Sequence, residues 1–213
     1  MNTQELVLKC KEQFNKAFGE NPQKIVLSPG RINIIGEHID YNHGFVLPAA
    51  IDKYICFAIS KNNTQDCHII SLDLNDKYQF NIKDKIEPVS QNWVNYFLGV
   101  FNQVQEKIDS GFDIVFSSTF PIGAGLSSSA ALECGFLFGL NHFFNLDLTK
   151  EQIAKMGQKA EHTFAGVNCG IMDQFASVFG KENHVIFLDC DTLDYQYAPA
   201  DFGEYTLLLL TPI

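Results

Sequence analysis

The first twenty residues carry apolar side chains at the three- and four-residue spacing of an α-helix. Five such positions follow one another: Leu6, Val7, Cys10, Phe14 and Phe18. Gly19 and Pro22 interrupt this pattern, and both residue types commonly end helices. The pattern therefore predicts an amphipathic helix over residues 3–18.

Runs of β-branched and aromatic residues dominate the next sixty positions, which favours strands. A strand-like run at 24–27 ends at Ser28-Pro29-Gly30, and further extended segments are predicted at 45–60, 68–72 and 78–82. The first third of the chain is therefore expected to be mostly sheet.

Helical spacing returns after residue 92, at Trp93, Phe97, Val100, Val104 and Ile108. Residues 112–116 then read as a buried strand, and a glycine-rich turn that starts at residue 121 leads into an apolar helix that continues to about residue 145.

The last third of the chain begins with another predicted helix, which Thr149 opens with Gln152 in the capping-box position. Residues 166–180 are predicted to form a glycine-rich loop and a short helix, and strands are predicted near 185–188 and 205–210. Because no repeat, linker or low-complexity segment interrupts the order, the chain is expected to form one mixed α and β domain.

Composition and charge exclude a disordered protein and argue against a nucleic-acid-binding protein. The 213 residues are 46% hydrophobic and 19% charged, which excludes disorder as the main state. Fifteen basic and 25 acidic residues give a net charge of −10, which repels a polyphosphate backbone. We therefore expect no nucleic-acid partner.

Six cysteines lie too far apart for a zinc ribbon or a thioredoxin-like site, and we expect reduced, mostly buried thiols. The N-terminus lacks a basic start followed by an apolar stretch, and no run approaches the ~18 apolar residues of a membrane span. A cytoplasmic location without a membrane partner is the expectation.

The strongest chemical signal is the run Gly-Ala-Gly-Leu-Ser-Ser-Ser-Ala at residues 123–130, between a predicted strand and a predicted helix. Glycines let backbone N–H groups approach an anion, and the helix N-terminus adds donors and a favourable dipole. The run lacks the Gly-Lys-Ser/Thr of a Walker loop. Two interpretations stay open: a phosphate-binding loop, or a glycine turn with a serine N-cap.

A second segment, residues 29–42, places six polar side chains between apolar ones: Arg31, Asn33, Glu37, His38, Asp40 and Asn42. Such a density of donors and acceptors suits a hydroxyl-rich ligand, because each buried hydroxyl needs a partner. The alternative is a solvated loop with surface ion pairs.

A third segment places Asp173 among Ile171, Met172 and Phe175, where a carboxylate needs a cationic or donor partner. Arg31 is the candidate partner. Glu161 lies near the end of the helix after Thr149, where the dipole opposes an acidic side chain. A bound metal ion would explain Glu161, and a surface glutamate is the alternative.

Taken in order, the three segments resemble the galactokinase branch of the GHMP kinase family. The segment at residues 29–42 is similar to the galactokinase signature, the run at 123–130 to the family's phosphate motif, and Gly-Ile-Met-Asp-Gln at 170–174 completes the set. The resemblance runs from about residue 24 to 191 and covers only the N-terminal part of such a kinase. A C-terminal domain, with its own glycine-rich segment and a sugar-contacting tyrosine, has no counterpart in the 213 residues.

The resemblance implies a fold and a set of site residues. The fold is α+β, a mixed-sheet N-terminal GHMP kinase domain over residues 1–213 with a left-handed β-α-β crossover of the ribosomal-protein domain-2-like type. The implied catalytic residues are Asp173 and Arg31, and the implied sugar ligands are Glu37, His38, Asp40, Gly170 and Asp173. The implied ATP-binding residues are Gly123, Ala124, Gly125, Leu126, Ser127, Ser128, Ser129, Ser71 and Trp93, and the implied Mg²⁺ ligands are Ser129 and Glu161.

Three positions depart from the family's pattern: Ile39 replaces a threonine, Asn168 a proline and Ala49 a cysteine. None of these changes removes a chemical group on which the assignment depends.

The implied reaction is Mg²⁺-dependent transfer of a phosphoryl group from ATP to the anomeric hydroxyl of galactose, giving galactose 1-phosphate and ADP. Asp173 would accept the hydroxyl proton or orient the hydroxyl, and Arg31 would hold that carboxylate ionised and face the transferring phosphoryl group. Galactose and ATP are the expected partners, and the complete protein is expected to be a monomer.

Two alternatives keep the same motifs: a kinase for a related sugar such as N-acetylgalactosamine, and a non-catalytic galactose and ATP sensor that regulates transcription. In such sensors the serine-alanine pair of the phosphate loop is altered, whereas residues 127–131 are intact here. This favours an enzyme. If 213 residues are the whole protein, one wall of the cleft is missing, and the chain would be inactive or would associate through an exposed apolar face.

Overall fold

Two β-sheets organise the part of the chain that the computed structural model describes, residues 1–120, 125–201 and 203–204. The strands of the larger sheet are β1 (Lys24–Asn33), β3 (Pro48–Lys61), β4 (Asp66–Ser71), β5 (Asp76–Asn81) and β6 (Phe112–Ser118). Their order is β1-β3-β6-β4-β5, in which β4 and β6 are parallel and the other neighbours antiparallel. The smaller sheet has the order β2-β7-β8, all antiparallel, from β2 (Phe45–Val46), β7 (His184–Asp189) and β8 (Tyr195–Pro199).

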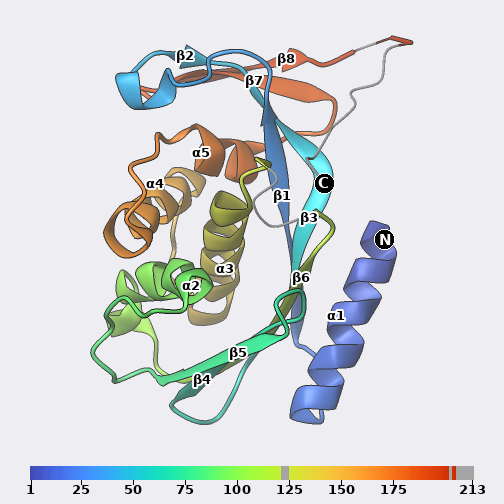
Figure 1. Ribbon diagram of the computed structural model, residues 1–213, viewed down its shortest axis with the longest axis vertical. Coiled ribbons are helices and arrows are strands. Elements are labelled where there is room, and N and C mark those ends of the chain that lie inside the picture. The colour runs from blue at the N-terminus through green and yellow to red at the C-terminus, as the bar shows by residue number, and fades with distance from the viewer. Residues whose placement is uncertain (121–124, 202, 205–213) are drawn as a thin grey trace.

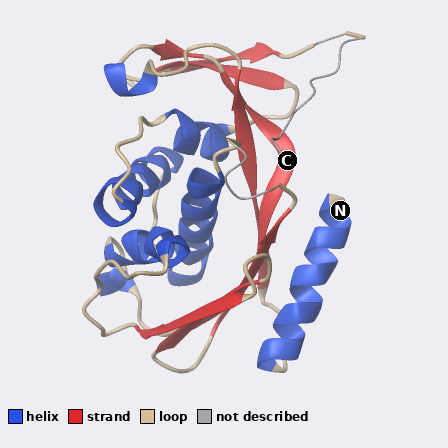
Figure 2. Ribbon diagram, in the orientation of Figure 1, coloured by secondary structure: helices blue, strands red, loops and turns tan. Residues whose placement is uncertain are grey.

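Helices cover the two faces of the larger sheet unequally. They are α1 (Thr3–Phe18), α2 (Asn92–Asn102), α3 (Ser128–Phe144), α4 (Lys150–Ala160) and α5 (Met172–Phe179). Helix α1 packs alone on one face, against β3 and β6, and α2 to α5 form a layer on the other (Figure 1). Figure 2 shows the small sheet above this layer, at the upper end of the long strands β1 and β3. The predicted α+β fold with a mixed sheet is confirmed.

The first helix is confirmed with its predicted bounds. Leu6, Cys10 and Phe14 are buried against the sheet. The Asn2 side chain accepts the backbone N–H of Glu5, whose side chain in turn accepts the N–H of Asn2, so a capping box starts the helix.

Strand β1 is longer than predicted, and the prediction that it ends at Ser28-Pro29-Gly30 is wrong. The strand continues to Asn33 across a register shift between Pro29 and Arg31. Because β1 is an edge strand, Pro29 costs no central ladder hydrogen bond, and the bulge accommodates the irregular residues.

The remaining predicted elements agree with the structure, with different bounds. The capping box at Thr149 and Gln152 is confirmed, and α3 ends one residue before Asn145. The predicted helix after residue 92 is divided into α2 and a short 3-10 helix, Gln105–Lys107. Strand β8 was not predicted, and the predicted strand at 205–210 lies outside the described residues.

An aromatic core holds α3 against the larger sheet. Phe136 of α3 lies with its ring centroid 4.9 Å from that of Phe97 in α2 and 5.5 Å from that of Phe112 in β6. A second core, which includes Phe175 of α5 and Ile186 and Leu188 of β7, fixes α5 beneath the small sheet. The N-terminal ends of α3 and α5 are thereby placed beside β1.

All six cysteines are free thiols, and five of them are buried. The prediction of reduced, mostly buried thiols is confirmed.

Candidate active site

Arg31 takes its place from the irregular part of β1. A Cβ atom at Gly30 would lie 2.9 Å from the Leu126 carbonyl oxygen, so only glycine lets the loop before α3 approach the strand this closely. The backbone N–H of Arg31 donates to the same carbonyl at 3.2 Å. Strand and loop are therefore held together at the residue where the arginine side chain begins.

The Arg31 guanidinium forms a two-pronged ion pair with Asp173, the second residue of α5. Its Nε lies 2.6 Å from Asp173 Oδ1 and its Nη2 lies 2.7 Å from Oδ2. The two side chains are only 12% and 24% exposed. This pairing confirms the predicted partner of Asp173, and the parallel bonds fix the orientation of the carboxylate.

The same guanidinium reaches the glycine-rich loop. Its Nη1 donates to the Gly125 carbonyl oxygen at 2.9 Å. Of the predicted loop residues, Gly123 and Ala124 lie outside the described residues, whereas Gly125, Leu126, Ser127, Ser128 and Ser129 are described. Arg31 thus joins the loop to Asp173.

Ser127 does not cap helix α3 with its side chain. Its backbone is left-handed (φ 57°), and its hydroxyl donates instead to Asp173 Oδ2. The helical ladder begins at the N–H of Ala131, which donates to the Ser127 carbonyl. The interpretation of this segment as a glycine turn with a serine N-cap is therefore wrong. The first N–H groups of α3 have no acceptor within the helix, and such groups at a helix N-terminus favour an anion.

Asp40 lies against Gly170 and close to Asp173. Any side chain at position 170 would collide with the Asp40 carboxylate, so glycine is required there. Burial raises the pKa of Asp40, and the negative charge of Asp173 raises it further, while the backbone N–H groups of Tyr41 and Met172 oppose the shift. Asp40, a candidate sugar ligand, thus lies close to Asp173, the candidate catalytic residue.

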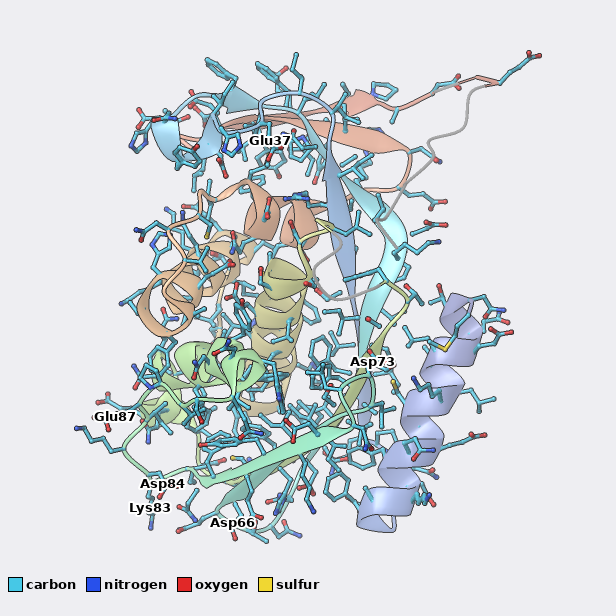
Figure 3. The ribbon with its side chains drawn as sticks, in the orientation of Figure 1. Glu37, Asp66, Asp73, Lys83, Asp84 and Glu87 are labelled. Carbon is cyan, nitrogen blue, oxygen red and sulfur yellow. The ribbon has the colours of Figure 1, made fainter. Side chains whose placement is uncertain are left out.

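Glu37 and His38 are exposed and are held by their own loop. Glu37 accepts a hydrogen bond from Asn33 Nδ2 at 2.9 Å, and His38 Nδ1 lies 2.9 Å from the Tyr41 hydroxyl. Figure 3 shows Glu37 at the upper end of the molecule, near the small sheet. The loop that leads into the 3-10 helix Asp40–Asn42 therefore presents Glu37 and His38 at the same end of the molecule as Asp40.

A cavity of about 440 Å³ lies beside these residues. Asp40 and Gly170 line it together with His162 and Cys169, but Arg31 and Asp173 do not. Its volume is in the range of small-molecule sites. The cavity therefore adjoins the Arg31–Asp173 pair without containing it.

Glu161 begins a π-helical turn, Glu161–Ala165, directly after α4, and it is only 6% exposed. The alternative of a surface glutamate is therefore wrong. Burial raises the pKa of Glu161, and hydrogen bonds from the side chains of Ser129, Cys169 and Gln174 oppose that shift. The two predicted metal ligands, Ser129 and Glu161, are thus neighbours.

Two buried residues beside Glu161 were given no role in the sequence analysis. Gln174 Nε2 donates to Glu161 Oε2 at 2.8 Å and to Glu133 Oε2 at 3.3 Å. Both Gln174 and Glu133 are fully buried. A carboxylate inside an apolar helix, four residues after Ser129, was the signal that could have identified Glu133.

Ser71 and Trp93 lie apart from this cluster. Ser71 is buried and its Oγ accepts the Leu74 N–H at 3.3 Å, within the turn between β4 and β5. The Trp93 indole N–H donates to Asp76 Oδ2 at 2.9 Å. In Figure 3 Asp73, in the same turn, lies near α1 and far below Glu37. The indole N–H of Trp93 therefore already has an acceptor within the chain.

No group of three or more His, Cys, Asp or Glu side chains in residues 1–120, 125–201 and 203–204 is arranged to hold a metal ion. No helix in the same ranges has the length and hydropathy needed to cross a membrane.

Comparison with known proteins identifies the family. The GHMP kinases N terminal domain matches residues 95–181, and the galactokinase galactose-binding signature matches residues 12–61. The chain belongs to the GHMP kinase family. The second match includes Arg31 and Asp40, and the first includes Asp173.

Curated relatives of this chain include galactokinases. That of Clostridium tetani is 41% identical over 213 residues, which covers 99% of this chain and 53% of the relative. That of Clostridium perfringens (strain 13) is 41% identical over 205 residues, with coverage of 94% and 53%. The chain therefore spans about half the length of the curated relatives that it matches.

Solved structures of kinases are also similar to this chain. The crystal structure of Lactococcus lactis galactokinase complexed with galactose has a TM-score of 0.84 at 35% identity, covering 92% of this chain and 52% of that chain. A mevalonate kinase structure, at 22% identity and a TM-score of 0.69, shares the fold.

Proposed function

We propose that this chain is the N-terminal part of a galactokinase, which transfers a phosphoryl group from ATP to the anomeric hydroxyl of galactose and releases galactose 1-phosphate and ADP. The galactokinase relatives and the galactose complex of the Lactococcus lactis enzyme support this assignment. The observation that carries it is the contact of Arg31 with both Asp173 and the glycine-rich loop.

That contact suits the demands of phosphoryl transfer. The reaction needs an acceptor hydroxyl, a phosphoryl group and compensating charge brought together, because its transition state is loose. Asp173 accepts or orients the hydroxyl proton, since its carboxylate is fixed on two oxygens by Arg31. The guanidinium compensates the charge of this carboxylate and contacts the loop that would hold the phosphates.

The sugar would lie on the opposite side of Asp173 from the loop. Asp40, packed on Gly170, and the exposed groups of Glu37 and His38 offer acceptors and donors to sugar hydroxyls. Ser71 and Trp93 are proposed to border the nucleotide, with the indole face as the contact surface. A second domain, supplied by a longer form of the protein, would complete the wall of the cleft.

The donor set fits Mg²⁺. Ser129 supplies a hydroxyl and Glu161 a carboxylate, both hard oxygen ligands, and Mg²⁺ usually takes one or two protein ligands with phosphate oxygens and water. A further observation supports the fit: the negative charges of Glu161 and Asp173 both raise the pKa of Glu133, and Arg31 is the cation that pairs with Asp173. Bound there, the ion would neutralise charge on the transferring phosphates.

We also propose a cytoplasmic location, because six free thiols, five of them buried, are typical of proteins from a reducing compartment.

A coupled ADP-release assay tests the proposal. This chain and the longest natural form of the protein are assayed with ATP, Mg²⁺ and galactose, and with N-acetylgalactosamine or glucose as matched controls. Galactose-dependent ADP release in the longer form is the expected result. Preference for N-acetylgalactosamine would assign a related sugar kinase, and binding of galactose and ATP without turnover in any form would assign a sensor.

A further inference from the structure

Gln174 occupies a position between two buried carboxylates. Its Nε2 donates to Glu161 Oε2 at 2.8 Å and to Glu133 Oε2 at 3.3 Å. All three side chains are buried, Gln174 and Glu133 completely. One amide group therefore joins two carboxylates that would otherwise face each other without a donor between them.

The three residues come from three different elements. Glu133 lies on α3, one helical turn after Ser129, so both face the same side of that helix. Glu161 starts the turn after α4, and Gln174 follows Asp173 on α5. The amide thus connects the phosphate-loop helix, the candidate metal ligand and the helix that carries the candidate base.

We propose that Gln174 is a positioning residue that holds the Glu161 carboxylate in place to bind Mg²⁺. This inference rests on the proposed function. The amide fixes Oε2 of Glu161, which would leave the other carboxylate oxygen for the ion.

An amide suits this position because it donates a hydrogen bond without adding charge. A lysine would compete with the divalent cation, and a further carboxylate would repel Glu161. Cys169 Sγ, 3.4 Å from Glu161 Oε2, is a weaker donor and approaches the same oxygen. Of these two donors, Gln174 therefore lies closer to that oxygen and binds it more strongly.

The alternative is that Gln174 only stabilises the fold, and Ser177 provides the matched control. Ser177 is a buried polar residue on the same helix, and its hydroxyl donates to the Pro29 carbonyl at 3.0 Å. Ser177→Ala removes a buried hydrogen bond from α5 without touching Glu161. A purely structural role predicts the same behaviour for the two variants.

The test uses Gln174→Met, which keeps the side-chain length, in the longest natural form of the protein. Calorimetry measures Mg²⁺ binding in the presence of ADP, and thermal unfolding is measured alongside. We expect about a 10- to 100-fold weaker Mg²⁺ affinity, the usual effect of removing a partner of a metal ligand. The Mg²⁺ concentration for half-maximal galactose phosphorylation should rise with it, while kcat at saturating Mg²⁺ and KM for galactose stay near the wild-type values.

A second variant keeps the proposal testable if Gln174→Met does not fold. Glu133→Met combined with Gln174→Met replaces the donor and one acceptor by apolar side chains of similar size, which is often close to neutral for stability. It should fold and still bind Mg²⁺ weakly. Wild-type Mg²⁺ affinity in this double variant, or in Gln174→Met, would overturn the role, as would an equal loss in Ser177→Ala.

The two proposals fail differently. If the wild-type protein binds Mg²⁺ with ADP but phosphorylates no sugar, the proposed function is wrong and the comparison of affinities still decides the role of Gln174. If the wild-type protein phosphorylates galactose and Gln174→Met has an unchanged Mg²⁺ dependence, the function holds and the role is wrong. ADP binding that is independent of Mg²⁺ in the wild-type protein would overturn the role.

Discussion

Three carboxylates near the glycine-rich loop, those of Asp173, Glu161 and Glu133, have two different kinds of partner. Asp173 is met by a guanidinium that forms two short hydrogen bonds with its oxygens. Glu161 and Glu133 lie deeper and share a neutral amide. Burial raises the pKa of Glu161, and it raises the pKa of Glu133 well above its usual value. One carboxylate has its cation within the chain, whereas the other two are left to a proton or a metal ion.

The difference follows from the cost of removing charge from water. A buried carboxylate needs an opposite charge, a proton or a metal ion, because hydrogen bonds alone rarely repay its desolvation. In the Arg31–Asp173 pair each charge has its opposite within hydrogen-bond distance. Glu133 and Glu161 have an amide donor between them and no such cation among the described residues, so substitutions in the two regions should have different consequences.

The largest effect is expected from Asp173→Asn in the longest natural form. Asparagine keeps the shape but removes the proton acceptor, so galactose-dependent turnover should fall by about 10²- to 10⁴-fold. Nucleotide affinity should remain nearly unchanged, which calorimetry with ADP can check. Near-normal turnover would exclude a role for Asp173 in the chemistry.

The next effect is expected from Glu161→Gln, which removes a candidate ligand from the uncompensated region. The Mg²⁺ concentration for half-maximal turnover should rise at least about 100-fold, more than a partner of the ligand would cost. Glu151→Gln, on the exposed side of α4, is the matched control. An unaltered Mg²⁺ requirement in Glu161→Gln would remove Glu161 from the metal site.

A smaller effect, on stability, is expected from Arg31→Met. The substitution leaves Asp173 without its cation, so the free energy of unfolding should fall by about 1.5–3 kcal/mol, the usual range for hydrogen bonds to charged groups. Arg31→Lys keeps the charge but not the two-pronged geometry and should lose less. Urea denaturation of this chain measures both, and equal stability of wild type and Arg31→Met would contradict the pairing.

The smallest effect is expected from Glu133→Gln, and it should depend on pH. Because the folded-state pKa of Glu133 lies above its unfolded value, the native state binds more protons, and this residue makes the protein less stable as pH rises through that interval. In EDTA, the variant should therefore gain on the order of 1 kcal/mol over wild type at pH 8 and less at pH 5.

Paired urea titrations of wild type and Glu133→Gln at the two pH values test this sign. A stability difference that is constant with pH, or that is larger at pH 5, would contradict a raised pKa for Glu133.

Local patterns determined much of the molecule because they depend only on neighbours in sequence. The spacing of Leu6, Cys10 and Phe14 determined α1, and Thr149 with Gln152 determined the start of α4. The need of Asp173 for a cation was also readable from its apolar neighbours, and Arg31 was identified as the partner. Neither β8 nor the continuation of β1 through Pro29 could be predicted from composition and spacing.

The sequence by itself determined which residue types the candidate site contains, because the motifs at residues 29–42, 123–130 and 170–174 carry those groups locally. Only the tertiary structure decided which of these groups meet. Gln174 joins Glu133 and Glu161, and Ser127 turns its hydroxyl to Asp173 instead of capping α3. The physical reason is that a buried polar group takes its partner from whichever element packs against it, and packing is set by the whole core, not by the neighbouring residues.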